Sequence, residues 1–190
     1  MESRRSSAWF SVVPVMFLGG VAAVTEPQPS PEPPVLVTSP AFEAGKEIPA
    51  RFTCQGENLS PALGWSGVPP QARSLVLVVD DPDAPDPAKP KLTWVHWVLY
   101  DLPPTSKGLP EGVAPAALPA GARQGKNSWK KPGYGGPCPP IGRHRYFFKL
   151  FVLDTVLGDL GTPDVAALQK AMQGHVIARG ELVGTYQKTQ

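Results

Sequence analysis

Residues 74–85 read SLVLVVDDPDAP, and this stretch indicates the class of fold. Its first seven residues form an almost wholly apolar run of strand length, which is typical of a strand buried on both faces. Asp81 follows this run and opens a turn in which Pro82 and Pro85 restrict the backbone, while Asp83 can accept nearby N–H groups. The stretch therefore predicts a buried strand that ends in a rigid, acidic turn.

The rest of the chain carries further strand patterns and one helix pattern. Five runs have strand length and a β-branched or aromatic composition; they lie at residues 35–38, 48–54, 93–100, 146–153 and 175–183. A helix is expected with Thr162 as its N-cap, Pro163 at its first helical position, Asp164 in its first turn and Gly174 closing its C-terminus. These patterns predict a mainly β domain with one or two short helices.

Composition and charge exclude several classes of protein. The chain holds 25 prolines and 19 glycines among 190 residues, and they interrupt nearly every window, which excludes long coiled coils and helical bundles. The apolar fraction of 42% is sufficient for a core, so wholesale disorder is excluded as well. The net charge is +2 and the basic residues form no stripe, which argues against a nucleic-acid binder.

The N-terminal segment differs in composition from the domain that follows. A basic start, an apolar run and small residues near Ala23 are together typical of an export signal. Residues 1–24 are therefore expected to be a signal peptide or an uncleaved membrane anchor, and residues 25–34 a Pro-rich linker. The domain is expected at residues 35–188, in a protein that is periplasmic, extracellular or anchored to the membrane. The alternative is a cytoplasmic protein whose start codon is misassigned.

Polar side chains gather where the predicted strands begin or end. His96 lies within one strand, and His144 and Tyr146 lie at the entry to another. Because His144 and Tyr146 are two residues apart, they are expected on one face of the sheet, about 7 Å apart. Asp81 lies just past the strand predicted at residues 74–80, so all four candidate pocket residues come from strand ends. Strand alternation over residues 94–100 places Trp94, His96, Val98 and Tyr100 on one face and Val95, Trp97 and Leu99 on the other.

Such side chains suit a small pocket for an anion. A neutral imidazole donates one N–H, and the hydroxyl of Tyr146 and the N–H groups of the glycine-containing segment 135–140 would add further donors. The carboxylate of Asp81 would repel a phosphate dianion, but it could accept from a protonated phosphate oxygen or meet an ammonium group. A phosphomonoester or phosphodiester is therefore expected rather than a polyphosphate, for which a Walker-type loop is missing.

Each of these residues also has a structural interpretation. A single histidine within a strand is more often a packed, hydrogen-bonded core residue than a ligand-binding group. Asp81 and Asp83 could only shape the turn, and a register slip of one residue would place Asp80 in the pocket instead of Asp81. His175 has no acidic or Tyr neighbour at pocket spacing, so it is interpreted as structural.

Several segments resemble a known family. Residues 81–85 (DPDAP), His96 with Trp97, and residues 135–146 (GGPCPPIGRHRY) resemble the signature segments of the phosphatidylethanolamine-binding proteins, also called Raf kinase inhibitor-like proteins. Residues 171–175 (AMQGH) and 181–186 (ELVGTY) are similar to the bacterial and archaeal branch. The resemblance covers about residues 35–188 in collinear order. Residues 127–129 (NSW) depart from it, because bacterial relatives usually show Asn-Asp-Phe-Gly there.

The resemblance implies a fold, a site and a class of function. The implied fold is a Greek-key β-sandwich with a large central antiparallel sheet, a smaller second sheet and one or two short helices. The implied protein is a non-enzymatic binding and regulatory module with no cofactor, and a kinase or a protease is a plausible partner. A cis bond before Pro85 or Pro140 is also suggested. The implied pocket residues are Asp81, Asp83, His96, Gly136, Pro140, His144 and Tyr146.

Two other functions stay open at the level of sequence. A hydrolase or lyase could use His/Asp acid–base chemistry, with Cys138 near His144 as the one credible nucleophile. A metal site could form from His96, His144 and Asp81, although their spacing is not distinctive. In an oxidising compartment, Cys54 and Cys138 could instead pair as a disulfide.

Overall fold

The strand at residues 74–81 organises the larger of two sheets. In the computed structural model, which describes residues 34–189, it is β3 (Ser74–Asp81), and all of its residues are buried. It pairs antiparallel with β4 (Trp94–Leu102) on one side and with β7 (Arg143–Leu153) on the other. The short β6 (Arg123–Gln124) borders β4 and the long β8 (Val176–Gln187) borders β7, which gives the order β6-β4-β3-β7-β8.

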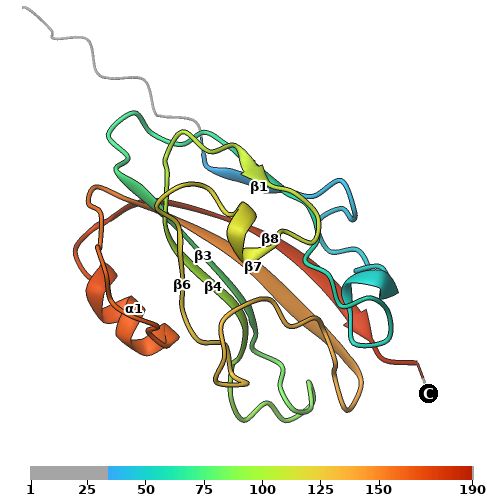
Figure 1. Cartoon of the computed structure of the whole chain (residues 1–190). Helices are drawn as coiled ribbons and strands as arrows, with labels where there is room; N and C mark the ends of the chain where they lie inside the picture. The colour runs from blue at the N-terminus through green and yellow to red at the C-terminus, as the bar shows by residue number, and fades with distance from the viewer. Residues whose placement is uncertain (1–33, 190) are drawn as a thin grey trace, which may run out of the picture. The chain divides into compact units, whose positions relative to one another are not determined.

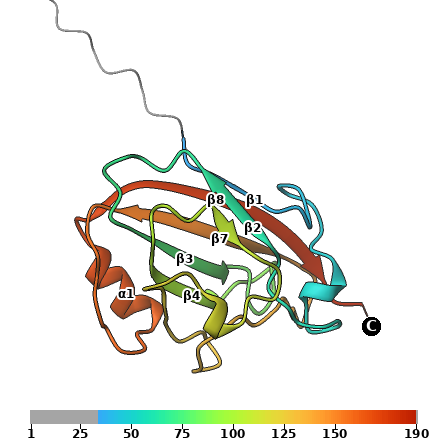
Figure 2. The same ribbon diagram turned by 45° about the horizontal axis from the view of Figure 1, so that its top comes forward.

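A smaller sheet covers one face of the large sheet, and a helix covers the other (Figures 1 and 2). The smaller sheet has the order β1-β2-β5, and all its pairs are antiparallel. Its strands are β1 (Leu36–Thr38), β2 (Leu63–Ser66) and β5 (Gly108–Leu109). The helix is α1 (Val165–Met172). The prediction of a mainly β fold with a large and a small antiparallel sheet and a short helix is confirmed.

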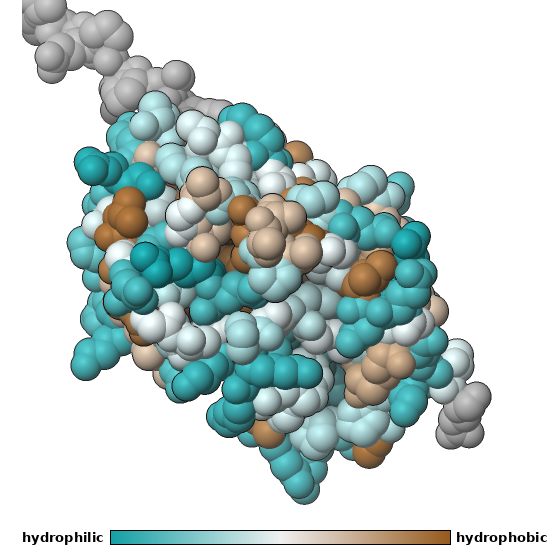
Figure 3. All heavy atoms as spheres, viewed as in Figure 1, coloured by the Kyte–Doolittle hydropathy of each residue, from teal (hydrophilic) through white to brown (hydrophobic). Residues whose placement is uncertain are grey.

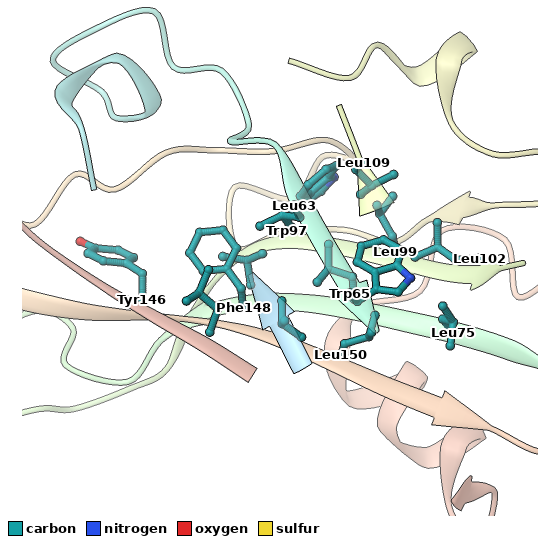
Figure 4. Close-up of a cluster of buried hydrophobic side chains, with 14 of the residues drawn as sticks. Leu63, Trp65, Leu75, Trp97, Leu99, Leu102, Leu109, Tyr146, Phe148 and Leu150 are labelled. Carbon is teal, nitrogen blue, oxygen red and sulfur yellow. The ribbon is translucent and has the colours of Figure 1, made fainter. Parts of the chain in front are cut away.

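Alternate residues of β3 enter two separate apolar clusters. Leu75, Leu77 and Val79 belong to the core between the two sheets, with partners such as Trp65 and Phe148 (Figure 4). Val76 and Val78 belong to a second cluster beneath Leu168 and Met172 of α1. Both faces of β3 are therefore covered, which explains why its sequence is continuously apolar instead of alternating.

Two predicted elements differ from the structure. The strand predicted at 48–54 is wrong: the chain there forms a 3-10 helix, η1 (Ala50–Phe52), which follows Pro49 and buries only Phe52. A second 3-10 helix, η2 (Pro115–Ala117), lies in the loop after β5. The N-cap of α1 is Asp164 and not Thr162, because the Asp164 Oδ1 accepts the N–H of Ala167 at 2.9 Å.

The alternation predicted for β4 fails at the N-terminal end of the strand. Val95 packs in the α1 cluster and not with Trp97 and Leu99, which face the smaller sheet. The cause is a shift of register between β3 and β4, where Val79 pairs with Trp97 but the next residue, Asp80, pairs with Val95. His96 is thus the extra residue of a β-bulge, a device that re-aims a side chain at the end of a strand pair.

The predictions for residues 1–24 and 25–34 fall on residues that, apart from Pro34, lie outside the described part of the chain. Within residues 34–189, no helix is long and apolar enough to span a bilayer.

Candidate functional site

A cavity of about 540 Å³ opens where the large sheet ends, between the β3–β4 loop and the β6–β7 connection. In Figure 1 both loops project from the lower end of the sheet. The cavity walls are mainly apolar, because prolines and aromatic rings outnumber polar groups among them. Its lining includes Asp81, Pro85, Leu92, Trp94, His96, Trp129, Lys131, Tyr134, Gly136, Pro140 and His144. The bond between Ala84 and Pro85, at the start of the β3–β4 loop, is cis.

Asp81 and His144 form a buried pair at the floor of this cavity. The Nδ1 of His144 lies 2.7 Å from Asp81 Oδ2, and its Nε2 lies 2.9 Å from the carbonyl oxygen of Ile141. The other carboxylate oxygen of Asp81 accepts the N–H of Asp83 at 2.8 Å. A carbonyl oxygen can only accept, so the Nε2–H of His144 donates to Ile141. Both nitrogens of His144 are thus occupied within the protein.

His96 differs from His144 in its hydrogen bonding and its protonation. Its Nδ1 donates to the carbonyl oxygen of Gly135 at 2.6 Å, and burial lowers its pKa to about 4. The ring is therefore neutral near pH 7, and Nε2 carries a lone pair with no proton. This Nε2 is buried and has no hydrogen-bond partner among the described residues.

Tyr146 lies against His96 and, like His96, has a buried polar atom without a hydrogen-bond partner in the described chain. The two rings meet edge to face, with centroids 5.2 Å apart. The Tyr146 hydroxyl is also buried and makes no well-formed hydrogen bond in the described chain, and burial together with the nearby Asp81 carboxylate raises its pKa. Tyr146 lies behind the cavity lining and not within it, and its ring stacks on that of His144 at 6.5 Å. His96 Nε2 belongs to a residue of the cavity lining and the Tyr146 hydroxyl to one behind it, and neither atom has a hydrogen-bond partner in the described chain.

Asp83 and Asp80 lie outside the cavity lining. Both oxygens of Asp83 accept from Arg145, at 2.7 Å from Nη2 and 2.9 Å from Nε, and these bonds lower the pKa of Asp83. Asp80 is buried on the opposite side of β3, where Lys149 Nζ lies within 2.8 Å of both oxygens. The pKa of Asp80 is raised because burial outweighs that ion pair. Asp81, and not Asp80, therefore faces the cavity.

The glycine-containing segment lines the cavity but does not offer its N–H groups to it. The N–H of Gly136 donates to Asn58 Oδ1 at 2.7 Å, and the N–H of Gly135 donates to the His96 carbonyl oxygen at 3.0 Å. The expectation that these groups serve as free anion donors is wrong for both residues. Glycine is required at 136 for space, since a Cβ there would collide with the carbonyl oxygen of Phe52.

A disulfide closes one wall of the cavity. Cys54 and Cys138 are bonded, with their Cα atoms 5.4 Å apart, and both line the cavity. A backbone hydrogen bond joins the same two segments, because the N–H of Cys54 donates to the Pro137 carbonyl oxygen at 3.1 Å. The thiolate nucleophile considered for Cys138 is therefore absent from this structure.

Comparison with known proteins identifies the family. Residues 38–187 match the family model described as phosphatidylethanolamine-binding protein. The chain belongs to this family. It is similar to the UPF0098 protein of Methanothermobacter thermautotrophicus. The two sequences are 48% identical over 149 residues, which cover 78% of this chain and 95% of that one. A UPF0098 protein of Chlamydia trachomatis is 44% identical over 152 residues, covering 80% and 98% of the two chains.

Solved structures of the phosphatidylethanolamine-binding protein family agree with this fold. The homologue CT736 of Chlamydia trachomatis superposes with a TM-score of 0.75 at 43% identity, over 82% of this chain and 99% of that one. YbcL of E. coli superposes with a TM-score of 0.73 at 32% identity and the same coverage. A carboxypeptidase Y inhibitor, solved with its cognate proteinase, has a TM-score of 0.51 at 21% identity and shares the fold alone.

The metal site considered for His96, His144 and Asp81 does not form. No group of three or more His, Cys, Asp or Glu residues within residues 34–189 is placed to hold a metal ion. The geometry gives the reason, because both ring nitrogens of His144 and the Nδ1 of His96 already bind protein atoms. His175 pairs with Asp154 at 2.9 Å on the exposed surface and takes no part in the cavity.

The structure also adds residues that sequence reasoning missed. Asn58 orients the backbone of Gly136, while Tyr134 lines the cavity and donates its hydroxyl to the Phe52 carbonyl oxygen at 3.0 Å. Neither residue lies in a motif or at a strand end, and Asn58 reaches the site from 78 positions away in sequence. Only tertiary contacts could have identified them.

Proposed function

We propose that this member of the phosphatidylethanolamine-binding protein family is a binding and regulatory protein, whose cavity receives a phosphate-type group. The group belongs to a small ligand or to a phosphorylated side chain. The pattern of residues 1–24 further supports export or membrane anchoring as the location of the protein.

One observation carries this proposal: two polar atoms, one in the cavity lining and one directly behind it, are buried without hydrogen-bond partners in the described chain. The Nε2 of His96 and the hydroxyl of Tyr146 lack hydrogen bonds in the described chain, while the groups around them are saturated. A buried polar atom without a partner costs about 1–3 kcal/mol, so such atoms usually receive a ligand, an ion or a water molecule. A ligand at the floor would remove this cost.

The chemistry of the two atoms selects the kind of group. Nε2 of neutral His96 can only accept, whereas the Tyr146 hydroxyl can donate. A group bound to both atoms must therefore donate one hydrogen bond and accept another. A phosphomonoester in its singly protonated state does both, and its single charge is tolerated better than a dianion beside the buried carboxylate of Asp81. Lys131 at the cavity wall supplies the balancing positive charge.

A protein partner is the second part of the proposed function. The carboxypeptidase Y inhibitor, which shares this fold, was solved bound to its proteinase. A regulatory module that inhibits a protease, or a kinase, is therefore consistent with the fold. The cavity would then bind a phosphorylated residue or a small ligand, and this binding would control the interaction with the protein partner.

Isothermal titration calorimetry tests the assignment. Inorganic phosphate and phosphoethanolamine are titrated into the wild-type chain, His96→Ala and the control His175→Ala. We expect wild type and His175→Ala to bind alike, because His175 lies on the exposed surface beside Asp154, and His96→Ala to bind at least tenfold more weakly. Equal affinities in all three proteins, with folding checked by near-UV circular dichroism, would sink the assignment.

A further inference from the structure

The disulfide in the wall of the cavity is accessible from the cavity itself. Its partners, Cys54 and Cys138, are the two cysteines of the sequence, and both line the cavity. Both residues are exposed, so the bond is not enclosed in the core. Exposed disulfides are typically the ones that small thiols open, whereas structural disulfides resist reduction. Molecules that enter this cavity therefore meet a disulfide of the reactive class.

The two segments that the disulfide joins are also held together by hydrogen bonds. The N–H of Cys54 donates to the Pro137 carbonyl oxygen at 3.1 Å. The N–H of Gly136 donates to Asn58 Oδ1 at 2.7 Å. Neither bond involves a sulfur atom, so both can persist when the S–S bond opens. The wall therefore has a second set of links that keeps the two segments adjacent.

The main chain around Cys138 is stiff. Cys138 lies between Pro137 and Pro139, and a proline fixes its own φ and also restricts the residue before it. The Cα atoms of Cys54 and Cys138 are 5.4 Å apart. Because this backbone has little freedom, the two thiols stay close after reduction and the disulfide can form again. Opening of the bond is thus expected to be reversible.

The cavity also carries a positive charge that favours an anionic reactant. Lys131 lines the cavity and takes part in no ion pair within residues 34–189. The carboxylate of Asp81, in the same lining, is bonded to His144 at 2.7 Å. Figure 3 shows mostly hydrophilic residues at the end of the sheet from which the cavity loops project. A charged small molecule therefore approaches the opening without crossing an extended apolar surface.

We propose that the disulfide between Cys54 and Cys138 is an exchange site for anionic low-molecular-weight thiols that enter the cavity. A small thiolate attacks one cysteine sulfur, a new S–S bond forms, and the other cysteine leaves as a thiolate that takes a proton from water. A second small thiolate then attacks the mixed disulfide, which releases the small molecule as its own disulfide and leaves both cysteines reduced. Two electrons pass from two small thiols to the protein, and the reverse steps restore the cross-link.

Exchange changes the cavity in two ways. In the mixed disulfide, the small molecule is attached to a lining residue and occupies part of the space of about 540 Å³. In the reduced protein, the covalent link in the wall is lost while the hydrogen bonds remain. The inference goes beyond the proposed function, because it depends on the accessible disulfide and the charge of Lys131 and not on the group bound at His96.

The kinetics of reduction of the oxidised full chain test the proposal. The protein is mixed with mercaptoethanesulfonate, an anionic thiol, in urea concentrations below the unfolding transition, and free cysteines are trapped with iodoacetamide and counted by mass spectrometry. We expect the protein to be reduced while near-UV circular dichroism stays native, at a rate that is proportional to thiol concentration and almost independent of urea. A rate that rises with urea in parallel with the unfolded fraction would overturn the proposal, because the disulfide would then open only in the unfolded chain.

A comparison of two thiols tests entry through the cavity. At low salt, Lys131→Gln should slow reduction by mercaptoethanesulfonate about threefold more than reduction by mercaptoethanol, which lacks the sulfonate charge. The matched control is Lys107→Gln, whose lysine lies outside the cavity lining, and it should show no such difference. Equal effects of Lys131→Gln on the two thiols would overturn the proposal.

Single-cysteine variants test the mixed disulfide directly. Cys54→Ser and Cys138→Ser each leave one cysteine in the wall and no partner to expel an adduct. With the disulfide form of mercaptoethanesulfonate, at least one folded variant should gain one small molecule, which mass spectrometry assigns to the remaining cysteine. Adducts that form in both variants only after unfolding would contradict the proposal.

Discussion

Replacing Tyr146 by Phe removes one atom from the proposed site and leaves everything else in place. The ring packs in the core between the sheets, edge to face with His96 and stacked on His144, and none of these contacts involves the hydroxyl. The hydroxyl itself is buried and makes no well-formed hydrogen bond in the described chain, and the Asp81 carboxylate near it disfavours only its ionised form. Tyr146→Phe should therefore separate ligand binding from stability, since the two effects have opposite signs.

The sizes of the changes in stability and in phosphate affinity follow from the unsatisfied hydrogen bonding of that hydroxyl. An unsatisfied buried hydroxyl costs about 1–3 kcal/mol, so its removal should stabilise the ligand-free protein by about 1 kcal/mol once the small void is allowed for. In a domain of this size, that raises the melting temperature by about 2–4 °C. A hydrogen bond to a charged ligand contributes about 1.5–3 kcal/mol, so the affinity for phosphate should fall roughly 10- to 150-fold.

Differential scanning calorimetry without ligand and isothermal titration with inorganic phosphate measure the two effects. Tyr100→Phe is the matched control, because the hydroxyl of Tyr100 donates to the Gly161 carbonyl oxygen at 2.9 Å, remote from the cavity. The control should lose about 1 kcal/mol of stability and keep its phosphate affinity. The reasoning is refuted if Tyr146→Phe is destabilised as much as Tyr100→Phe and binds phosphate as tightly as wild type.

Three further predictions concern the structure around the site. Between pH 6.5 and 4 the unfolded chain binds a proton at His96 that the folded chain excludes, so stability should fall by about 3 kcal/mol as pH drops through this window. Chemical denaturation of wild type and His96→Gln at pH 7 and pH 4 checks this, and a variant with the same slope as wild type would contradict it. Reduction of the disulfide between Cys54 and Cys138 reopens a loop of 84 residues and should cost about 4 kcal/mol, measured by urea unfolding with and without a reductant; an unchanged midpoint would count against it. Gly136→Ala forces the new methyl group against the Phe52 carbonyl oxygen, so calorimetry should show both a lower melting temperature and weaker phosphate binding, whereas a wild-type profile would show that the segment adapts.

Most of the large sheet could be predicted from local sequence, and the physical reason is its burial. The residues of β3 are apolar on both faces, so no other element competes with a strand there. The short strands β2, β5 and β6 have two to four residues each, and they exist only because neighbouring strands accept their hydrogen bonds. The run at 48–54 has strand composition, yet it contains the 3-10 helix η1, and Ile48 before this helix and Phe52 within it enter the core.

The sequence predicts which residues gather at the site, but it does not predict the hydrogen bonds that they form. Asp81, His96 and His144 do converge, because β3 ends and its antiparallel neighbours β4 and β7 begin at the same end of the sheet. Nε2 of His96 stays free while both nitrogens of His144 are bonded, and this depends on the carbonyl groups of residues 135 and 141, whose positions no local pattern encodes. The bulge that aims His96 toward Tyr146 likewise results from strand pairing and leaves no trace in the sequence.

The most direct test of the proposed site is a nitrogen-15 NMR titration of the histidine side chains with inorganic phosphate. Without phosphate, His96 should show a proton on Nδ1 and a bare Nε2 near pH 7, because its pKa is lowered to about 4. On saturation with phosphate, the Nε2 resonance of His96 should move strongly while both ring nitrogens of exposed His175 stay in place. A His96 Nε2 that does not move at a phosphate concentration saturating the calorimetric signal would contradict the central claim.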